Sequence, residues 1–273
     1  MRVLLFLFLV IKMVNFKYFL GSIFAIPLLP LLYFQGKRIK ATVPRLPEAQ
    51  GTEGLVSIGA VRTISMITVG ESTIAGVGVA SHEIGFSGTL AKELATKLKV
   101  NVSWKVYAKS GYTAKRVAEK IVPSIAEKEI DLIVIGLGGN DAFALNSPNQ
   151  WGRDIEKLIF ALEKRYANTP IAFTNMPPIK EFPAFTAAMK FTLGNLVELL
   201  GEKLEQVVAR RSHVYYQSQN ITLKDWIERM NIDSSEKDFF SDGVHPSKLT
   251  YQTWAKDFSD FIIQERILNS LRH

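Results

Sequence analysis

The sequence of 273 residues contains no cysteine. Disulfide bonds, thiolate catalysis and cysteine-ligated zinc are therefore excluded, and so is a lipid anchor attached to an N-terminal cysteine. Without cysteines, the sequence does not indicate whether the protein resides in an oxidising or a reducing compartment.

Acidic residues are absent from residues 1–47, which carry seven lysines and arginines. The net charge of +7 comes entirely from this segment, because the other 26 basic residues balance the 26 acidic ones. A nucleic-acid-binding domain would carry its basic residues on the folded part. The composition therefore argues against a nucleic-acid partner and predicts a formally neutral globular domain.

Two apolar runs lie near the N-terminus, at residues 3–11 and 18–34. The second has 17 residues, the lower limit for crossing a hydrocarbon core of about 30 Å, and membrane helices tolerate prolines such as Pro27 and Pro30. The best candidate for a signal-peptide cleavage site, Ala25, lacks a small residue two positions before it. We therefore predict an uncleaved membrane anchor over residues 1–35. The alternative is a hydrophobic helix packed on the protein itself.

The residues after the anchor divide into two parts. Residues 36–60 contain glycine, proline and several charges, and we interpret them as a linker. Residues 61–273 are long enough for one globular domain. Basic residues flank the second apolar run on both sides, so either side of the membrane is possible for this domain.

From residue 63 onward, short apolar runs alternate with segments of helical periodicity. The predicted strands are residues 63–70, 102–108, 131–139, 170–176 and 213–217, and the predicted helices are 84–98, 113–128, 152–167, 192–211 and 250–267. This alternation is typical of a five-stranded parallel sheet covered by helices on both faces. Ligands of such sheets bind beyond the carboxyl ends of the strands.

Three of the predicted strands end in residues that can carry chemistry. Ser72 follows the first strand, Gly111 follows the second, and Asn140 follows the third in the segment Gly-Gly-Asn-Asp. Near the C-terminus, Asp242 stands three residues before His245 in a glycine-containing turn. An acid at this spacing can reach back and orient the histidine ring.

These four segments, in this order, resemble the SGNH (GDSL-type) hydrolase superfamily, and the resemblance covers residues 63–265. The segment with Pro177-Pro178, Phe182-Pro183 and Phe185 also resembles bacterial members of this superfamily. This resemblance implies a bacterial inner membrane for the anchor, with the globular domain on its periplasmic or cytoplasmic side. The sequence departs from the family pattern at Glu71, where an aspartate is usual. We expect this change to affect local packing rather than chemistry.

The resemblance implies a flavodoxin-like, three-layer α/β/α fold and a set of residue roles. Ser72 would be the nucleophile, His245 its base and Asp242 the residue that orients the histidine. The oxyanion hole would be formed by the N–H groups of Ser72 and Gly111 and the amide of Asn140. No metal or organic cofactor is implied.

Each residue taken alone has a simpler interpretation. Ser72 is suited to cap a helix, Asn140 and Asp141 to form a polar turn, and His245 to lie on the surface. Asp141 is also a candidate for contact with the substrate. The remaining histidines, His82, His213 and His273, have no acid at the same spacing, and we interpret them as structural or solvated.

The connection over residues 176–195 is long and contains Phe182 and Phe185. Long connections are often binding loops, so both phenylalanines are candidates for lining an acyl pocket or touching lipid. The alternative is that they pack as ordinary core.

The sequence thus predicts a membrane-anchored serine esterase whose substrate is a small acyl ester or a lipid. Lysophospholipids, thioesters and O-acetylated sugars all fit this description. A catalytically silent member that binds an acylated ligand and an acyltransferase are the alternatives.

Overall fold

A computed structural model describes residues 2–268 of the chain, with side chains from residue 13 onward. Within this range one sheet has six strands in the order β1-β3-β2-β4-β5-β6. The strands are β1 (Glu53–Val56), β2 (Thr63–Gly70), β3 (Asn101–Ala108), β4 (Leu132–Gly136), β5 (Ile171–Phe173) and β6 (Val214–Tyr216). All neighbouring pairs are parallel except β1 with β3. The five predicted strands are present, and β1 is a sixth.

β1 lies within residues 36–60, which the sequence analysis interprets as a linker, and that interpretation is wrong in two places. Residues 53–56 pair with β3, and residues 36–42 complete a helix. β1 has no apolar run because it is a half-exposed edge strand. Gly54 permits it to pair there, since a Cβ atom at this position would lie 2.6 Å from the Trp104 ring.

The parallel strands follow the order β3-β2-β4-β5-β6, so the chain runs outward in opposite directions from β2 and β4. In doubly wound sheets, ligands bind where the direction of winding reverses, beyond the carboxyl ends of the strands. Ser72 follows β2 and Asn140 follows β4, so the topology brings these two residues to that point.

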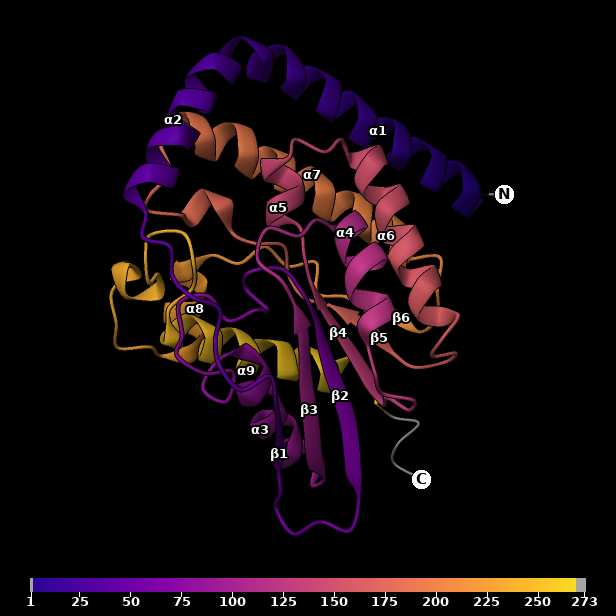
Figure 1. Cartoon of the computed structure of the whole chain (residues 1–273). Helices are drawn as coiled ribbons and strands as arrows, with labels where there is room; N and C mark the ends of the chain where they lie inside the picture. Colours follow the sequence, from indigo (N-terminus) through magenta and orange to yellow (C-terminus); the bar gives the residue numbers. More distant parts are fainter. Residues whose placement is uncertain (1, 269–273) are drawn as a thin grey trace.

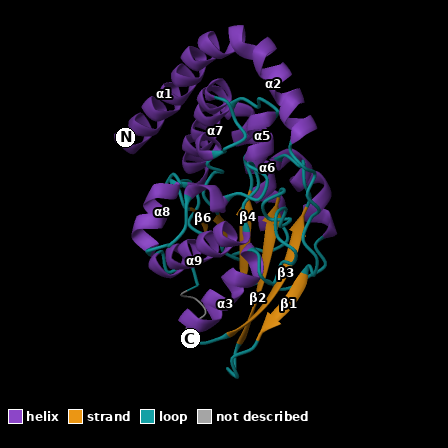
Figure 2. Cartoon of the chain, turned by 90° about the vertical axis from the view of Figure 1, so that its left-hand side faces the viewer, coloured by secondary structure: helices purple, strands orange, loops and turns teal. Residues whose placement is uncertain are grey.

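Helices cover both faces of the sheet (Figures 1 and 2), which confirms the three-layer α/β/α prediction. One face packs against α3 (Phe86–Leu98) and α9 (Lys248–Gln264), and the other against α6 (Pro148–Glu163) and α7 (Ala187–Val208). Shorter helices are α4 (Ala114–Arg116), α5 (Gly139–Phe143) and α8 (Leu223–Met230), and the last two were not predicted from the sequence.

The helix predicted over residues 113–128 is much shorter than expected. After α4 the chain makes a π turn (Val117–Ile121) and a 3-10 turn (Val122–Ser124). Pro123 explains the early end, because proline cannot donate the backbone hydrogen bond that continues a helix.

The N-terminal segment forms α1 (Arg2–Ala25), η1 (Ile26–Leu28) and α2 (Leu29–Thr42). The bend between the two helices falls at Pro27 and Pro30, where helices commonly kink. Figure 1 shows α1 lying across α7 on the outside of the helix layer. Residues 13–42 contain an 18-residue stretch with a mean hydropathy of 1.6, which is long and apolar enough to cross a membrane, as a membrane anchor or a signal sequence would be.

The same segment also packs on the globular domain. Val14 is 1% exposed, and Lys17 forms an ion pair of 2.7 Å with Glu202 of α7. Leu32 and Ile39 of α2 pack against the core. The sequence analysis treats a membrane anchor and a helix packed on the protein as alternatives, but the structure gives this segment features of both.

Candidate active site

An open groove of about 1030 Å³ lies at the carboxyl ends of the strands. Ser72, Gly111, Asn140 and His245 all line it, although up to 173 residues separate them in the sequence. The structure therefore brings together the nucleophile, the base and the oxyanion-hole residues that the sequence analysis selected.

Ser72 is the second residue after β2, in a turn in which the N–H of Val77 donates to the carbonyl of Ser72. Its side chain caps no helix among residues 2–268, in contrast to the simpler interpretation of this serine. The turn is held from the far side by α9, where the buried hydroxyl of Tyr251 donates to the Val77 carbonyl at 2.8 Å. This contact fixes the position of Ser72 relative to the sheet.

Asp242 and His245 form a short, closed turn. The His245 Nδ1 lies 2.8 Å from Asp242 Oδ2, while Asp242 Oδ1 accepts the backbone N–H groups of Val244 and His245. Burial alone would raise the pKa of the Asp242 carboxyl, but the N–H groups and the His245 ring lower it below its ordinary value. The Asp242 side chain has no exposed surface, so its negative charge acts on the histidine and not on solvent.

The second ring nitrogen of His245 is free to act. Within the described residues, neither His245 Nε2 nor Ser72 Oγ makes a hydrogen bond to the protein, and both residues line the groove. Such links between base and nucleophile are often long before substrate binds.

Gly78 explains how the serine turn and the histidine turn come so close. A Cβ atom at Gly78 would lie 2.4 Å from the Pro246 carbonyl oxygen, and its φ of 102° disfavours other residues. The Ser241 hydroxyl, which donates to the Gly78 carbonyl at 2.9 Å, joins the two turns. Neither role is visible in the sequence, because both depend on contact between segments far apart in the chain.

Three N–H donors surround the space next to Ser72. The backbone N–H groups of Ser72 and Gly111 have no hydrogen-bond acceptor within the described part of the chain. The Asn140 Nδ2 donates one hydrogen to the Tyr112 carbonyl at 3.2 Å, which leaves its second hydrogen available. These donors fit the predicted oxyanion hole.

Glu71 does more in the site than the local packing expected from the sequence. Its carboxylate accepts the backbone N–H groups of Gly139 and Asn140 at 2.8 and 2.9 Å, so it ties the residue before the nucleophile to the turn that carries Asn140. Burial raises the pKa of Glu71 to about 7, although the two N–H groups lower it. Its position next to Ser72 in the sequence marked Glu71 as a residue of interest, but its hydrogen-bond partners, Gly139 and Asn140, could not be predicted from the sequence.

Asp141 does not line the groove, and the prediction that it contacts substrate is corrected. Its side chain is fully buried and accepts the N–H of Ala114 and the amide of Asn146. Burial raises the pKa of Asp141 to about 6. The residue holds the turn after β4 in shape, as the simpler interpretation proposes.

The two phenylalanines of residues 176–195 differ in position. Phe185 lines the groove, while Phe182 lines a separate internal cavity of about 40 Å³. Both are less than a tenth exposed and belong to the core, with ring centroids 5.3 Å apart. Phe185 thus belongs to both the core and the groove, and Phe182 supports it from behind.

His82 and His213 do not line the groove. His82 is buried, which lowers its pKa to about 4, and His213 lies 3.2 Å from the Glu163 carboxylate. His273 is outside the described residues. Among residues 2–268, no three His, Asp or Glu side chains are grouped to hold a metal ion.

Comparisons with known proteins identify similar sequences and folds. A model of the GDSL-like lipase/acylhydrolase family matches residues 68–253, more than half of the chain. No match was found among curated proteins.

Solved structures share the fold. A family 3 carbohydrate esterase of Clostridium thermocellum is 19% identical with a TM-score of 0.56, and the match covers 78% of this chain and 100% of that one. A lipolytic G-D-S-L protein of Veillonella parvula is 16% identical with a TM-score of 0.53, covering 74% and 99%. A lipase/acylhydrolase of Enterococcus faecalis is 18% identical with a TM-score of 0.51, covering 73% and 95%.

Proposed function

The chain belongs to the GDSL-like lipase/acylhydrolase family, and on this premise we propose that it is a serine esterase acting through Ser72, His245 and Asp242. The observation that carries the proposal is the Asp242–His245 pair, whose free ring nitrogen belongs to the same groove as Ser72. A histidine held in this way is suited to accept a proton from a serine hydroxyl.

The reaction would proceed in two halves. The Ser72 oxygen attacks the carbonyl carbon of the ester while His245 Nε2 takes the hydroxyl proton, and this proton then passes to the departing alcohol. Water next attacks the acyl-serine, gives its proton to the same nitrogen, and the acid leaves as Ser72 regains its hydrogen. Asp242 keeps Nδ1 protonated throughout, so that Nε2 is the basic nitrogen.

Negative charge on the carbonyl oxygen would be stabilised by the N–H groups of Ser72 and Gly111 and by the amide of Asn140. Removing one such donor typically costs about 2.7–4 kcal/mol of transition-state stabilisation. Glu71 supports this arrangement as a positioning residue, since it holds the backbone of Asn140 and does not itself line the groove.

The test of the esterase is turnover of p-nitrophenyl esters by the full chain in detergent. Ser72→Ala should reduce the rate by roughly 10⁴-fold or more, while Ser218→Ala, which changes an exposed serine outside the groove, should retain it. Equal rates in both variants would rule out Ser72 as the nucleophile. Absence of turnover on every ester would favour the silent binding protein, and transfer to an added alcohol in preference to water would indicate an acyltransferase.

We also propose that the N-terminal helices attach the enzyme to a membrane. Phe16, Phe19 and Phe24 of α1 are each more than half exposed, and exposed apolar patches of this kind mark interaction surfaces. The full chain should float with phospholipid vesicles in a density gradient, and replacing these three residues with serine should leave much of it behind. Flotation unchanged by the triple replacement would contradict attachment through this face.

A further inference from the structure

Helix α2 forms one wall of the groove that holds the candidate catalytic residues. The residues of α2 that line it include Leu29, Leu32, Tyr33, Gly36 and Ile39. A segment with the composition of a membrane anchor is thus part of the surface that a substrate at Ser72 would touch.

Specific contacts fix the position of this wall. Gln35 of α2 accepts a hydrogen bond of 2.8 Å from Thr186, the residue that caps α7. The chain after α2 is joined to the active-site turns: the Ser110 N–H donates to Glu48 at 2.8 Å, and the Ala49 N–H donates to the Ala75 carbonyl at 2.9 Å. Gln35 thus ties the wall to the start of α7, and the chain that follows α2 is tied to the Gly111 turn and to the Ser72 turn.

The groove is apolar, and several of its side chains are only partly covered. Leu29, Tyr33, Phe143 and Leu145 line it and are between 37% and 59% exposed. Leu145 has a φ of 54°, a conformation that is uncommon for leucine. The volume of about 1030 Å³ is at the upper end of the usual range for ligand pockets, about 300–1,000 Å³. An acetyl group would leave most of this surface uncovered, whereas a long acyl chain would cover it.

Two basic side chains, Lys40 and Arg45, line the groove, and no acidic side chain of the described residues does. Neither basic side chain has an ion-pair partner within the same part of the chain. A ligand with an anionic group next to its acyl chain would therefore match both the apolar wall and the charge.

We propose that α2 is part of the substrate-binding site, where the groove holds the long acyl chain of a lipid ester and Lys40 and Arg45 bind its anionic phosphate headgroup. This proposal rests on the proposed esterase, whose reaction requires the ester carbonyl at Ser72. The helix that would attach the enzyme to the membrane thereby also selects what the enzyme hydrolyses.

The first test fills the groove. No atom lies within 4 Å of a Cβ atom built at Gly36, so Gly36→Phe adds a large side chain without a clash of its Cβ atom at a residue that lines the groove. Gly21→Phe is the matched control, because Gly21 has equal room on α1 and does not line the groove. In the full chain, Gly36→Phe should lower the ratio of palmitate to butyrate hydrolysis at least tenfold, and Gly21→Phe should not change it. An unchanged ratio in Gly36→Phe would overturn the acyl groove.

The second test removes charge. Lys40→Gln/Arg45→Gln should raise KM at least tenfold for palmitoyl lysophosphatidylglycerol and much less for monopalmitoylglycerol, which has no phosphate. Lys37→Gln/Arg38→Gln removes the same charge from residues outside the groove lining and should raise neither value. Equal effects of the two double variants, or equal effects on the two lipids, would overturn the headgroup site.

Failure of this proposal is distinguishable from failure of the esterase. Butyrate hydrolysis that requires Ser72 keeps the esterase whatever happens to the palmitate ratio. If no ester is hydrolysed, binding of lysophosphatidylglycerol to the Ser72→Ala protein remains measurable. Gly36→Phe should then weaken the binding at least tenfold, and equal binding with and without this replacement would reject the groove independently of catalysis.

Discussion

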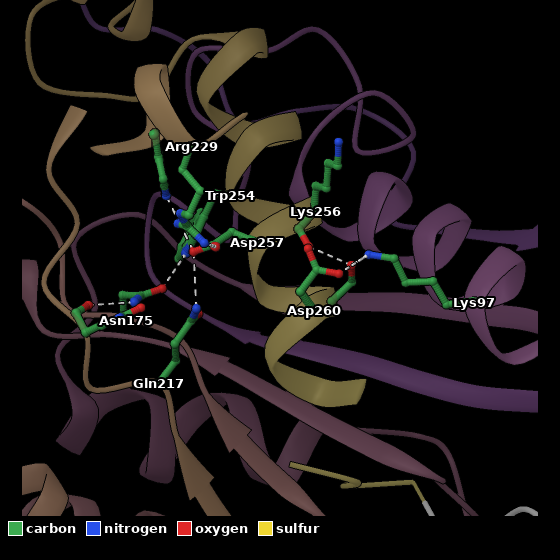
Figure 3. A network of polar contacts seen from close by, with 11 residues as sticks. Lys97, Asn175, Gln217, Arg229, Trp254, Lys256, Asp257 and Asp260 are labelled. Atoms are coloured by element: carbon green, nitrogen blue, oxygen red, sulfur yellow. Dashed lines mark hydrogen bonds and ion pairs between the residues drawn. The ribbon is translucent and has the colours of Figure 1, made fainter. Parts of the chain in front are cut away.

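Two aspartates, Asp242 and Asp257, are held in similar ways but in different surroundings. Both side chains are nearly or fully buried, and each accepts three hydrogen bonds from nearby donors. Asp242 lies in the turn next to the groove. Asp257 lies on α9 and accepts from Gln217, Trp226 and Arg229, as Figure 3 shows for the cluster around it.

The difference between the two clusters is what the partner of each carboxylate can do. The second ring nitrogen of His245 makes no hydrogen bond within the described residues, and it belongs to the groove that Ser72 also lines. The Arg229 guanidinium has only donor groups, and the Asp257 cluster lines other surface hollows than the groove of Ser72. A buried carboxylate therefore indicates catalysis only when its partner side chain can accept a proton and lines a cavity that also contains a nucleophile. Asp257 instead joins α8 and α9 to the end of β6.

The test of this comparison with the largest expected effect is to replace each aspartate by asparagine in a separate variant. Asp242→Asn keeps an acceptor for the backbone N–H groups but presents an amide N–H to the ring, which favours the histidine tautomer with a proton on Nε2. That tautomer cannot accept the serine proton, so kcat should fall by roughly 10³–10⁴-fold while the protein stays folded. The rate of p-nitrophenyl butyrate hydrolysis checks this, and a loss below tenfold would remove Asp242 from the triad.

Asp257→Asn is the matched replacement in the structural cluster. It removes the charge from a hydrogen bond with Arg229 and leaves Gln217 and Trp226 with a poorer acceptor, which should cost about 2 kcal/mol of stability. The melting temperature should fall by about 5 °C, while kcat of the folded protein should change less than twofold. The comparison breaks if Asp257→Asn loses activity as Asp242→Asn does.

The smallest expected effect concerns Glu71, which joins the nucleophile turn to Asn140. The raised pKa of about 7 in the folded protein means that the unfolded chain loses this proton first as pH rises. The contribution to stability is therefore complete below the ordinary glutamate pKa and is lost as pH rises through 7, with a slope of at most about 1.4 kcal/mol per pH unit. The side chain of Glu71→Gln cannot ionise. The free energy of unfolding of the wild type, relative to that of this variant, should therefore decrease from pH 5 to pH 8. A difference independent of pH would contradict the buried, titrating carboxyl.

The sequence was sufficient for the parts of the molecule that depend on local pattern. β4 is buried along its whole length, so an apolar run predicts it and places Asn140 at its end. Asp242 and His245 are three residues apart, so their contact follows from a single turn. The edge strand β1 is half exposed and pairs with β3 through Gly54, which no periodicity reveals.

Contacts between distant segments explain the rest of what the sequence did not reveal. Glu71 meets Gly139 and Asn140 only because β2 and β4 are neighbours in the sheet. Gly78 matters because the turn of Ser241 lies against it. The sequence did not reveal that α2 forms a wall of the groove, because the apolar composition of this segment indicated a role in the membrane.

The most direct measurement of the central claim is to locate the covalent adduct left by an alkyl fluorophosphonate, which reacts with activated serine hydroxyls. After reaction of the full chain, peptide mass spectrometry should find one adduct per chain, on Ser72. Asp242→Asn should form it much more slowly, while Asp257→Asn should form it at the wild-type rate. An adduct on another residue, or continued ester hydrolysis after complete labelling of Ser72, would contradict the assignment of the active site.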